Sequence, residues 1–283
     1  MHKSLAFFQH QPIRFLDHSN TSTIFTFSNE AMTSFAIDDA IATAVSNGEV
    51  NPTARIWVHN DTIVLGILDS RLPYLERGLN FLQANDYRAV IRNSGGLAVA
   101  LDKGVVNLSF ILPNKGAVSI HDGYDLMYAF IQEVFKRYTS KIKAYEIVGS
   151  YCPGDYDLSI NGIKFAGISQ RRVRDGVAVQ IYIDVEGNSK KRASIVKQFY
   201  SLSKGRENTN YIYPEVNPEV MGTISELTHT PFTVHEVIQM IHQTMIDLGA
   251  FIDPKNLLPS EETVFIKRLE QMKKRNEKIS TYL

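Results

Sequence analysis

The sequence lacks a second cysteine, because Cys152 is the only one among its 283 residues. A single thiol excludes internal disulfides and any zinc site built from several cysteines. In a reducing compartment this thiol stays free. It is therefore either a small buried apolar group or a nucleophile, and the surrounding sequence has to decide between the two.

Long apolar runs are missing as well. No run approaches the roughly 18 residues of a membrane-spanning helix, and the first residues, MHKSLAFFQHQ, turn polar too soon for a signal peptide. Lys plus Arg and Asp plus Glu both number 30, so no dominant field recruits nucleic acid. We therefore expect a cytosolic protein with neither a membrane nor a nucleic-acid partner.

Nucleotide-binding and hydrolase motifs are also absent. The chain has no GxxxxGK[ST], GxGxxG or GxSxG pattern, so phosphate loops, dinucleotide sites and serine hydrolases find no support. None of the eight histidines falls in an HExxH pattern. We expect no metal site and no cofactor.

Strand and helix patterns alternate along the chain. Strands are predicted at 54–59, 62–68, 87–92, 97–101, 105–112, 156–160, 163–174 and 177–185, and within 5–27, where short apolar runs fit helices as well. Helices are predicted at 34–47, with Asp38 and Asp39 off the apolar stripe, and at 75–85, 126–138, 193–202, 218–227, 233–249 and from Ser260. Asn60-Asp61 is expected to turn one strand directly into the next. The order indicates a mixed α/β body to about residue 205 with a helical region packed on it.

Cys152 lies at a bend, between Tyr151 and the pair Pro153-Gly154. A bend can present a side chain to a pocket, whereas a core cysteine more often sits inside a regular apolar run. This context favours the nucleophile over the buried apolar group. A nucleophilic thiol needs a neighbour that stabilises its anion, and Lys164 is the candidate.

Lys164 interrupts a strand of small and apolar residues. Strand alternation places it on one face with Ala166 and Ile168, and Phe165 on the other. The alternative is a solvated lysine beside the turn Asn161-Gly162. If the chain ran straight, Cys152 would lie roughly 23 Å from the position opposite Lys164, so Pro153-Gly154 has to fold the chain back.

A polar loop, Asn93-Ser94-Gly95-Gly96, follows Arg92. It is either a plain connection or a ligand loop, whose glycines let backbone N–H groups approach a carbonyl or an anion. Arg92 could help to hold such a group. Further along the chain, three arginines suggest a docking surface for an acidic protein: Arg171, Arg172 and Arg174.

Two segments, RNSGGLAVALDKGVVNLSF and NGIKFAG, resemble the lipoate-protein ligase and octanoyltransferase family. The likeness spans residues 30 to 230 or so. It implies an α+β structure, the biotin/lipoyl protein ligase catalytic fold, with a mixed and antiparallel sheet flanked by helices. It also implies a catalytic domain over 1–230 and a helical C-terminal extension over 231–283 packed on it.

The same resemblance assigns roles to residues. Cys152 would carry the acyl group as a thioester, and Lys164 would stabilise its thiolate. The acyl site would be lined by Arg92, Ser94, Gly95, Gly96 and Gly167. Burying an octanoyl tail contributes about 0.8 kcal/mol per CH₂, so an apolar slot is expected, with Val99, Ile168 and Phe165 as its predicted walls.

The activity also follows from the resemblance. ATP-using ligases of this family usually carry a glycine where Leu97 stands and a histidine where Leu101 stands, and they lack the cysteine, which argues against ATP activation. The segment SYCPGDYDLSINGIKFAGISQRR resembles a branch that moves an octanoyl or lipoyl group between protein lysines. The implied donor is the octanoylated or lipoylated glycine cleavage H protein, and the implied acceptors are lipoyl domains of 2-oxo acid dehydrogenase acyltransferase subunits. The alternatives are an octanoyl-acyl carrier protein donor, an ATP-dependent lipoate-protein ligase, and a protein that only binds lipoyl domains.

Overall fold

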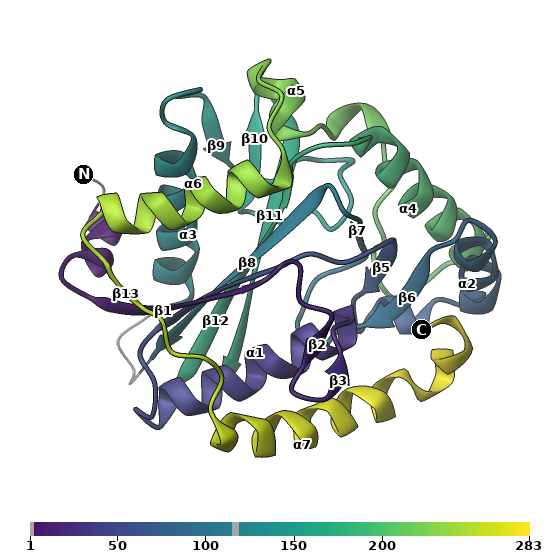
Figure 1. Cartoon of the computed structure of the whole chain (residues 1–283). Coiled ribbons are helices and arrows are strands. Elements are labelled where there is room, and N and C mark those ends of the chain that lie inside the picture. The colour runs from purple at the N-terminus through teal and green to yellow at the C-terminus, as the bar shows by residue number, and fades with distance from the viewer. Residues whose placement is uncertain (1–2, 115–118) are drawn as a thin grey trace.

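An eight-stranded mixed sheet forms the centre of the structure (Figure 1). The computed structural model describes residues 3–114 and 119–283. In spatial order the strands are β13 (Phe251–Asp253), β1 (Pro12–His18), β4 (Thr53–Trp57), β8 (Val105–Pro113), β12 (Gly176–Asp184), β11 (Ile163–Val173), β10 (Asp157–Ile160) and β9 (Ile142–Ala144). The first three run parallel, and all other neighbours pair antiparallel. The predicted mixed sheet and the meander β10-β11-β12 are confirmed.

A second sheet of three strands stands beside the large one: β6 (Arg88–Ile91), β5 (Thr62–Leu65) and β7 (Val99–Leu101), with β5 in the middle. The expected hairpin of β4 and β5 is wrong, because Asn60-Asp61 carries the chain from one sheet to the other. The polar loop Asn93-Ser94-Gly95-Gly96, called the glycine loop below, joins β6 to β7 as predicted. The two strands flank β5 instead of pairing with each other. A separate two-stranded ribbon consists of β2 (Thr23–Ile24) and β3 (Phe27–Ser28).

Helices cover both faces of the large sheet (Figure 1). The α-helices are α1 (Ala31–Ser46), α2 (Leu75–Ala84), α3 (Ile120–Phe135), α4 (Ser189–Lys204), α5 (Ile224–Thr228), α6 (Val234–Asp247) and α7 (Pro259–Asn276). Short 3-10 helices lie at Lys3–Phe8, Asp69–Arg71, Pro218–Val220 and Glu277–Tyr282. One core lies between the sheet, α3 and α6, and the other joins α1, α4, α7 and the small sheet.

The sequence of α1 explains its central place. It is apolar or small on almost every face, so it can be buried between the large sheet and α7. Asp38 and Asp39, expected outside the apolar stripe, are buried at 1% and 2% exposure. Each is paired with an arginine that arrives from the sheet, Arg55 on β4 and Arg171 on β11.

Strands β9 and β13 were not predicted from the sequence, because three residues are too few to show the alternation of a strand. The helix expected at 218–227 is broken into a 3-10 turn and α5, because Met221 and Gly222 run beside β11 and hydrogen-bond there. In the C-terminal region α6 and α7 form as predicted, while β13 joins the edge of the large sheet. The division at residue 230 stays a prediction. No helix in the described ranges has the length and apolar character needed to cross a membrane.

Candidate active site

Cys152 is held in a strained backbone conformation. Its φ angle is +46°, in the left-handed region that side chains other than glycine rarely adopt. Such a residue costs roughly 1–3 kcal/mol and persists where the surroundings enforce it, often at functional sites. The bend at Pro153-Gly154 returns the chain to β10, as the pairing of Cys152 with Lys164 requires.

Two N–H donors surround the Cys152 sulfur. The backbone N–H of Leu97 donates to Sγ at 3.2 Å, and the Arg92 guanidinium does so through Nη2 at 3.5 Å. Arg92 Nη2 also donates to the Leu97 carbonyl at 3.0 Å. Cationic and N–H donors stabilise a thiolate. The glycine loop therefore supplies the sulfur with its polar environment.

Lys164 contacts the backbone of the nucleophile. It is fully buried, and Nζ forms an ion pair with Asp157 Oδ1 at 2.7 Å. Nζ also donates to the carbonyls of Tyr151 at 2.9 Å and Cys152 at 3.0 Å, and to Ser150 Oγ at 3.2 Å. Among the described residues, the hydrogen bonds to the sulfur come from Leu97 and Arg92. Lys164 thus places its charge under the bend and holds the strained turn.

Asp157 balances that charge. It also accepts from the Ile147 N–H at 3.1 Å and from Ser150 Oγ at 3.3 Å. Burial raises the pKa of Asp157, although the Lys164 charge and the N–H donors act in the opposite direction. The pair Lys164–Asp157 is therefore a buried ion pair with several hydrogen bonds on each side.

A β-bulge changes the faces expected for β11. Ser159 pairs with Lys164 and Leu158 with Ala166, so Phe165 is the extra residue. A Cβ built on Gly167 would lie 3.5 Å from Lys164 Cε, which puts Lys164 and Gly167 on one side. The predicted grouping of Lys164 with Ala166 is wrong, because simple alternation does not account for the inserted residue.

A cavity of about 250 Å³ opens beside Cys152. The predicted site residues that line it are Arg92, Gly95, Gly96, Cys152 and Gly167. Lys164 and Ser94 are buried and do not line the cavity. The apolar walls include Val99 and Ile168 as predicted, together with Phe35 and Trp57. Phe165 is not a wall, because it packs against Phe135 in the core on the other face of the sheet.

Two glycines keep this cavity open. Gly96 has a φ of +94°, and a Cβ there would lie 2.2 Å from Arg92 Nη2 and 3.0 Å from Cys152 Sγ. A Cβ on Gly167 would lie 2.8 Å from Tyr182 Cε1. Both positions therefore need glycine for close packing of the groups around the sulfur.

The far end of the glycine loop is fixed by a buried carboxylate and a tyrosine. The Ala98 N–H donates to Tyr200 Oη at 2.9 Å, and Tyr200 donates to Asp69 Oδ1 at 2.9 Å. Asp69 Oδ2 accepts from the Gly66 N–H at 2.7 Å. Burial raises the pKa of Asp69 to about 6. This chain of contacts holds the segment that carries the Leu97 N–H.

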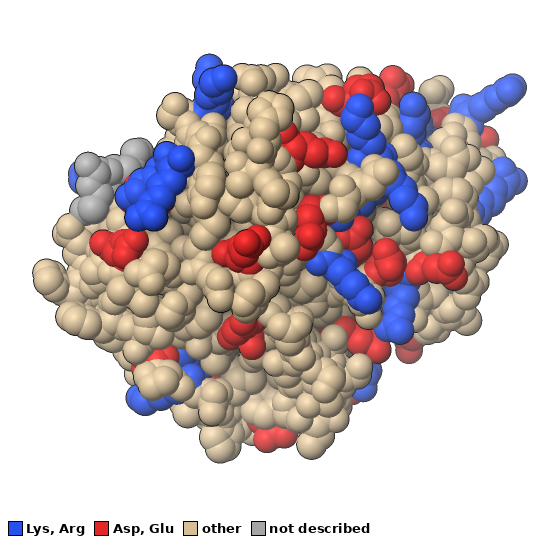
Figure 2. All heavy atoms as spheres, turned by 45° about the horizontal axis from the view of Figure 1, so that its top comes forward, with Lys and Arg blue, Asp and Glu red and all other residues tan. Residues whose placement is uncertain are grey.

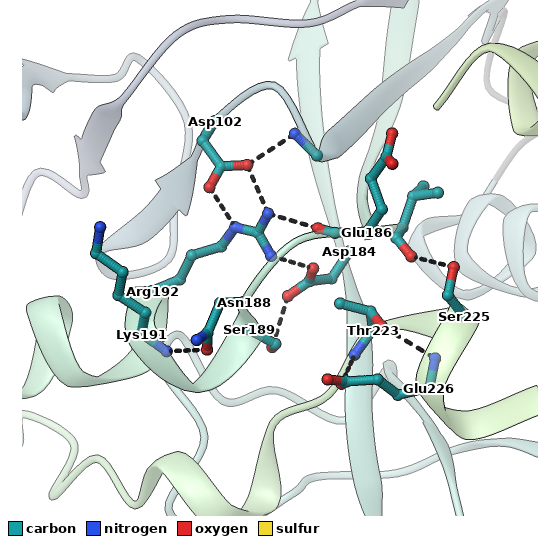
Figure 3. Close-up of polar contacts among 12 residues, drawn as sticks. Asp102, Asp184, Glu186, Asn188, Ser189, Lys191, Arg192, Thr223, Ser225 and Glu226 are labelled. Carbon is teal, nitrogen blue, oxygen red and sulfur yellow. Dashed lines mark hydrogen bonds and ion pairs between the residues drawn. The ribbon is translucent and has the colours of Figure 1, made fainter. Parts of the chain in front are cut away.

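A second ion-pair network joins the two sheets (Figure 3). The Arg192 guanidinium on α4 lies between Asp184, at the end of β12, and Asp102, just after β7. Its bonds to Asp102 are 2.7 and 2.6 Å long, and that to Asp184 is 2.6 Å. Asp184 also accepts from Ser189 at 2.6 Å. The network fixes β7, and with it the cavity wall.

On the face in Figure 2, basic and acidic side chains are interspersed. Arg171, expected at a docking surface, is bound to Asp39 and to the Asn93 carbonyl. No cluster of metal-ligating side chains occurs within 3–114 and 119–283. A larger cavity, of about 660 Å³, lies between the start of α1 and the start of α6, and none of its described lining residues is a predicted site residue.

Residues 30–246 match the family model of the lipoyl protein ligase A/B catalytic domain. The chain belongs to the lipoyl protein ligase A/B family. The family suggested by the sequence is thereby confirmed. The cavity, the glycine loop and the bend at Cys152 of this family member all lie inside the matched region.

Curated relatives of this family member extend over most of its length. A protein from Oceanobacillus iheyensis, named octanoyl-[GcvH]:protein N-octanoyltransferase, is 52% identical over 268 residues, which cover 95% of this chain and 96% of the relative. A protein of the same name from Lysinibacillus sphaericus is 44% identical over 271 residues, which cover 95% of this chain and 96% of the relative.

Solved structures share the fold. The structure of protein Ta0514 from T. acidophilum with bound lipoic acid matches with a TM-score of 0.69 at 14% identity, over 93% of this chain and 96% of that chain. A lipoate-protein ligase A bound with ATP matches with a TM-score of 0.67 at 14% identity, over 93% and 95%. The predicted catalytic fold is confirmed.

Sequence reasoning missed several groups around the sulfur. Asp157 carries no local signal, because its role depends on Lys164 across the hairpin. The Leu97 N–H is a backbone group that no residue type reveals. Gln180 on β12 lines the cavity and donates to Asp38, which the alternation of that strand could have indicated.

Proposed function

We propose that this chain is an acyltransferase that carries the acyl group on Cys152. It moves an octanoyl or lipoyl group from a modified lysine of the glycine cleavage H protein to a lipoyl-domain lysine of a 2-oxo acid dehydrogenase acyltransferase subunit. The observation that carries the proposal is the strained Cys152, which lines an acyl-sized cavity with two N–H donors at its sulfur. The shared name of the relatives supports this donor.

The chemistry needs no energy source. The Cys152 sulfur attacks the octanoyl-lysine carbonyl, the C–S bond forms, the C–N bond breaks, and the thiol proton goes to the departing lysine amine. The acceptor lysine then attacks the thioester, and its proton returns to the sulfur. An amide is exchanged for an amide, so no nucleotide is consumed.

The site residues divide this work. Arg92 and the Leu97 N–H stabilise the thiolate that leaves in the second step. The loop glycines Gly95 and Gly96 line the cavity beside the sulfur, and we assign their backbone N–H groups to the oxyanion. Lys164 holds the turn and contributes positive charge below it. The apolar walls bury the octanoyl tail, which contributes roughly 5 kcal/mol at about 0.8 kcal/mol per CH₂.

A donor comparison tests the proposal. The chain is incubated, without ATP, with octanoylated H protein or with octanoyl-acyl carrier protein, and intact-mass analysis follows octanoylation of Cys152. We expect rapid loading from the H protein and slow loading from the carrier protein. The reverse preference would assign the carrier-protein reaction. Loading from neither donor, together with lipoyl-domain modification by Cys152→Ala when ATP and free octanoate are added in a parallel reaction, would assign a ligase. We place this reaction in the cytosol, where a reducing environment keeps the single thiol free for acyl transfer.

A further inference from the structure

The C-terminal helix α7 reaches the end of strand β6, just before Arg92 and the glycine loop. Asn276, which is fully buried at the end of α7, accepts from the Ile91 N–H through Oδ1 at 2.7 Å and donates to the Ile91 carbonyl through Nδ2 at 3.0 Å. Nδ2 also donates to the Met272 carbonyl at 2.9 Å, which fixes the orientation of the amide. Ile91 ends β6, an outer strand of the small sheet, so the Asn276 amide takes the place of a neighbouring strand.

A second series of contacts, the second route, connects α7 to Asn93, two residues after Ile91. Arg268 Nε lies 3.8 Å from Asp39 Oδ2, and Asp39 accepts two bonds from Arg171, of 2.6 and 2.8 Å. Arg171 Nη1 in turn donates to the Asn93 carbonyl at 2.8 Å. Helix α7 is therefore linked to the backbone on both sides of Arg92, directly at Ile91 and through Asp39 and Arg171 at Asn93.

Arg92 depends on this support. It is 6% exposed, its Nε has no partner among the described residues, and no described carboxylate lies within ion-pair distance of its guanidinium. Its guanidinium donates to the Leu97 carbonyl and the Cys152 sulfur. With no carboxylate to anchor the side chain, the position of the guanidinium follows from the backbone at Ile91 and Asn93.

We infer that α7 positions the acyl-transfer site, with Asn276 as the main positioning residue. The inference rests on the proposed function, because it assigns α7 to the geometry of the same sulfur. Helix α7 lies outside the matched catalytic region, which ends at residue 246, and Figure 1 shows it running along α1 to end beside β6. The C-terminal region thus completes the site without touching the substrate.

The test compares two substitutions in one helix. Asn276→Ala removes the bonds to Ile91, whereas Leu269→Ala removes a buried apolar side chain of α7 that has no hydrogen-bonding group. Two rates are measured for each purified variant below its unfolding temperature: octanoyl loading of Cys152 at saturating octanoylated H protein, and alkylation of Cys152 by iodoacetamide at pH 7.

We expect Asn276→Ala to lower the saturated loading rate by about 10- to 100-fold, as for a small misplacement of reacting groups, and to slow alkylation. Leu269→Ala should lower the thermal midpoint while both rates stay at the wild-type level. Wild-type rates in Asn276→Ala, or equal losses in both variants, would overturn the inference. If wild-type protein does not load at all, the proposed function fails, and the alkylation rates still decide whether α7 positions the thiol.

A second pair of surface substitutions tests the inference if Asn276→Ala does not fold. Arg268→Ala removes the outer contact of the second route, and Lys267→Ala removes the same charge from the neighbouring exposed position. Slower loading and alkylation in Arg268→Ala alone support the inference. Equal rates in the two variants contradict the second route.

Discussion

The buried ion pair of Lys164 and Asp157 allows structural and chemical roles to be separated. Lys164→Met leaves Asp157 as an unpaired buried carboxylate, and breaking such a pair typically costs about 3–5 kcal/mol. The double variant Lys164→Met/Asp157→Asn removes both charges of this pair. Its remaining cost is the loss of a donor to the carbonyls of Tyr151 and Cys152, about 1–3 kcal/mol for each orphaned group.

We therefore expect the double variant to be more stable than Lys164→Met by roughly 2 kcal/mol in urea unfolding, since it avoids the buried unpaired charge. Loading of Cys152 should stay low in both variants, because the charge below the thiol is missing in both. The matched control is Asp157→Asn, which keeps the Lys164 side chain and its bonds to the two carbonyls. A double variant that loads at the wild-type rate would refute the role given to Lys164, and one no more stable than Lys164→Met would refute the buried pair.

Three further predictions concern the loop, the buried acid and the cavity. Gly96→Ala should abolish loading while leaving the fold intact by circular dichroism, because its Cβ would lie 2.2 Å from Arg92 Nη2. Burial raises the pKa of Asp69 from 3.8 to about 6 in the folded protein, so its contribution to the free energy of unfolding falls by about 3 kcal/mol as pH rises from 4 to 6. Urea unfolding at several pH values should show this fall in the wild type and not in Asp69→Asn. The same pH dependence in both proteins would contradict the burial effect. Val99→Phe narrows the slot beside the sulfur and should slow octanoyl loading more than butanoyl loading, whereas an equal effect on both would argue that the tail binds elsewhere.

The sequence predicted most regular elements because their apolar periods are long. In the meander, β10 and β12 are continuous buried runs and two-residue turns separate the strands, α1 is apolar or small along its length, and α3 and α6 bury one apolar stripe each. It could not assign strands to sheets. Whether β5 pairs with β4 or enters a second sheet depends on contacts with β6 and β7, which lie far along the chain.

The candidate site was predictable where chemistry is local. Cys152 stood out through its bend, and the glycines of 95–96 through their backbone freedom. The partners of Lys164 were not predictable, because a β-bulge at Phe165 changes the face on which it lies. The support from α7 was hidden for a different reason, since Asn276 lies 185 positions from Ile91 in sequence.

The most direct test of the central claim is a single-turnover experiment on the intact protein. Octanoylated H protein is mixed with the chain in the absence of ATP, a lipoyl domain is added, and intact masses are followed in time. The account predicts one octanoyl group on Cys152 that disappears as the lipoyl domain gains it, and no transfer by Cys152→Ala. Octanoylation of the lipoyl domain by Cys152→Ala at the wild-type rate would contradict it.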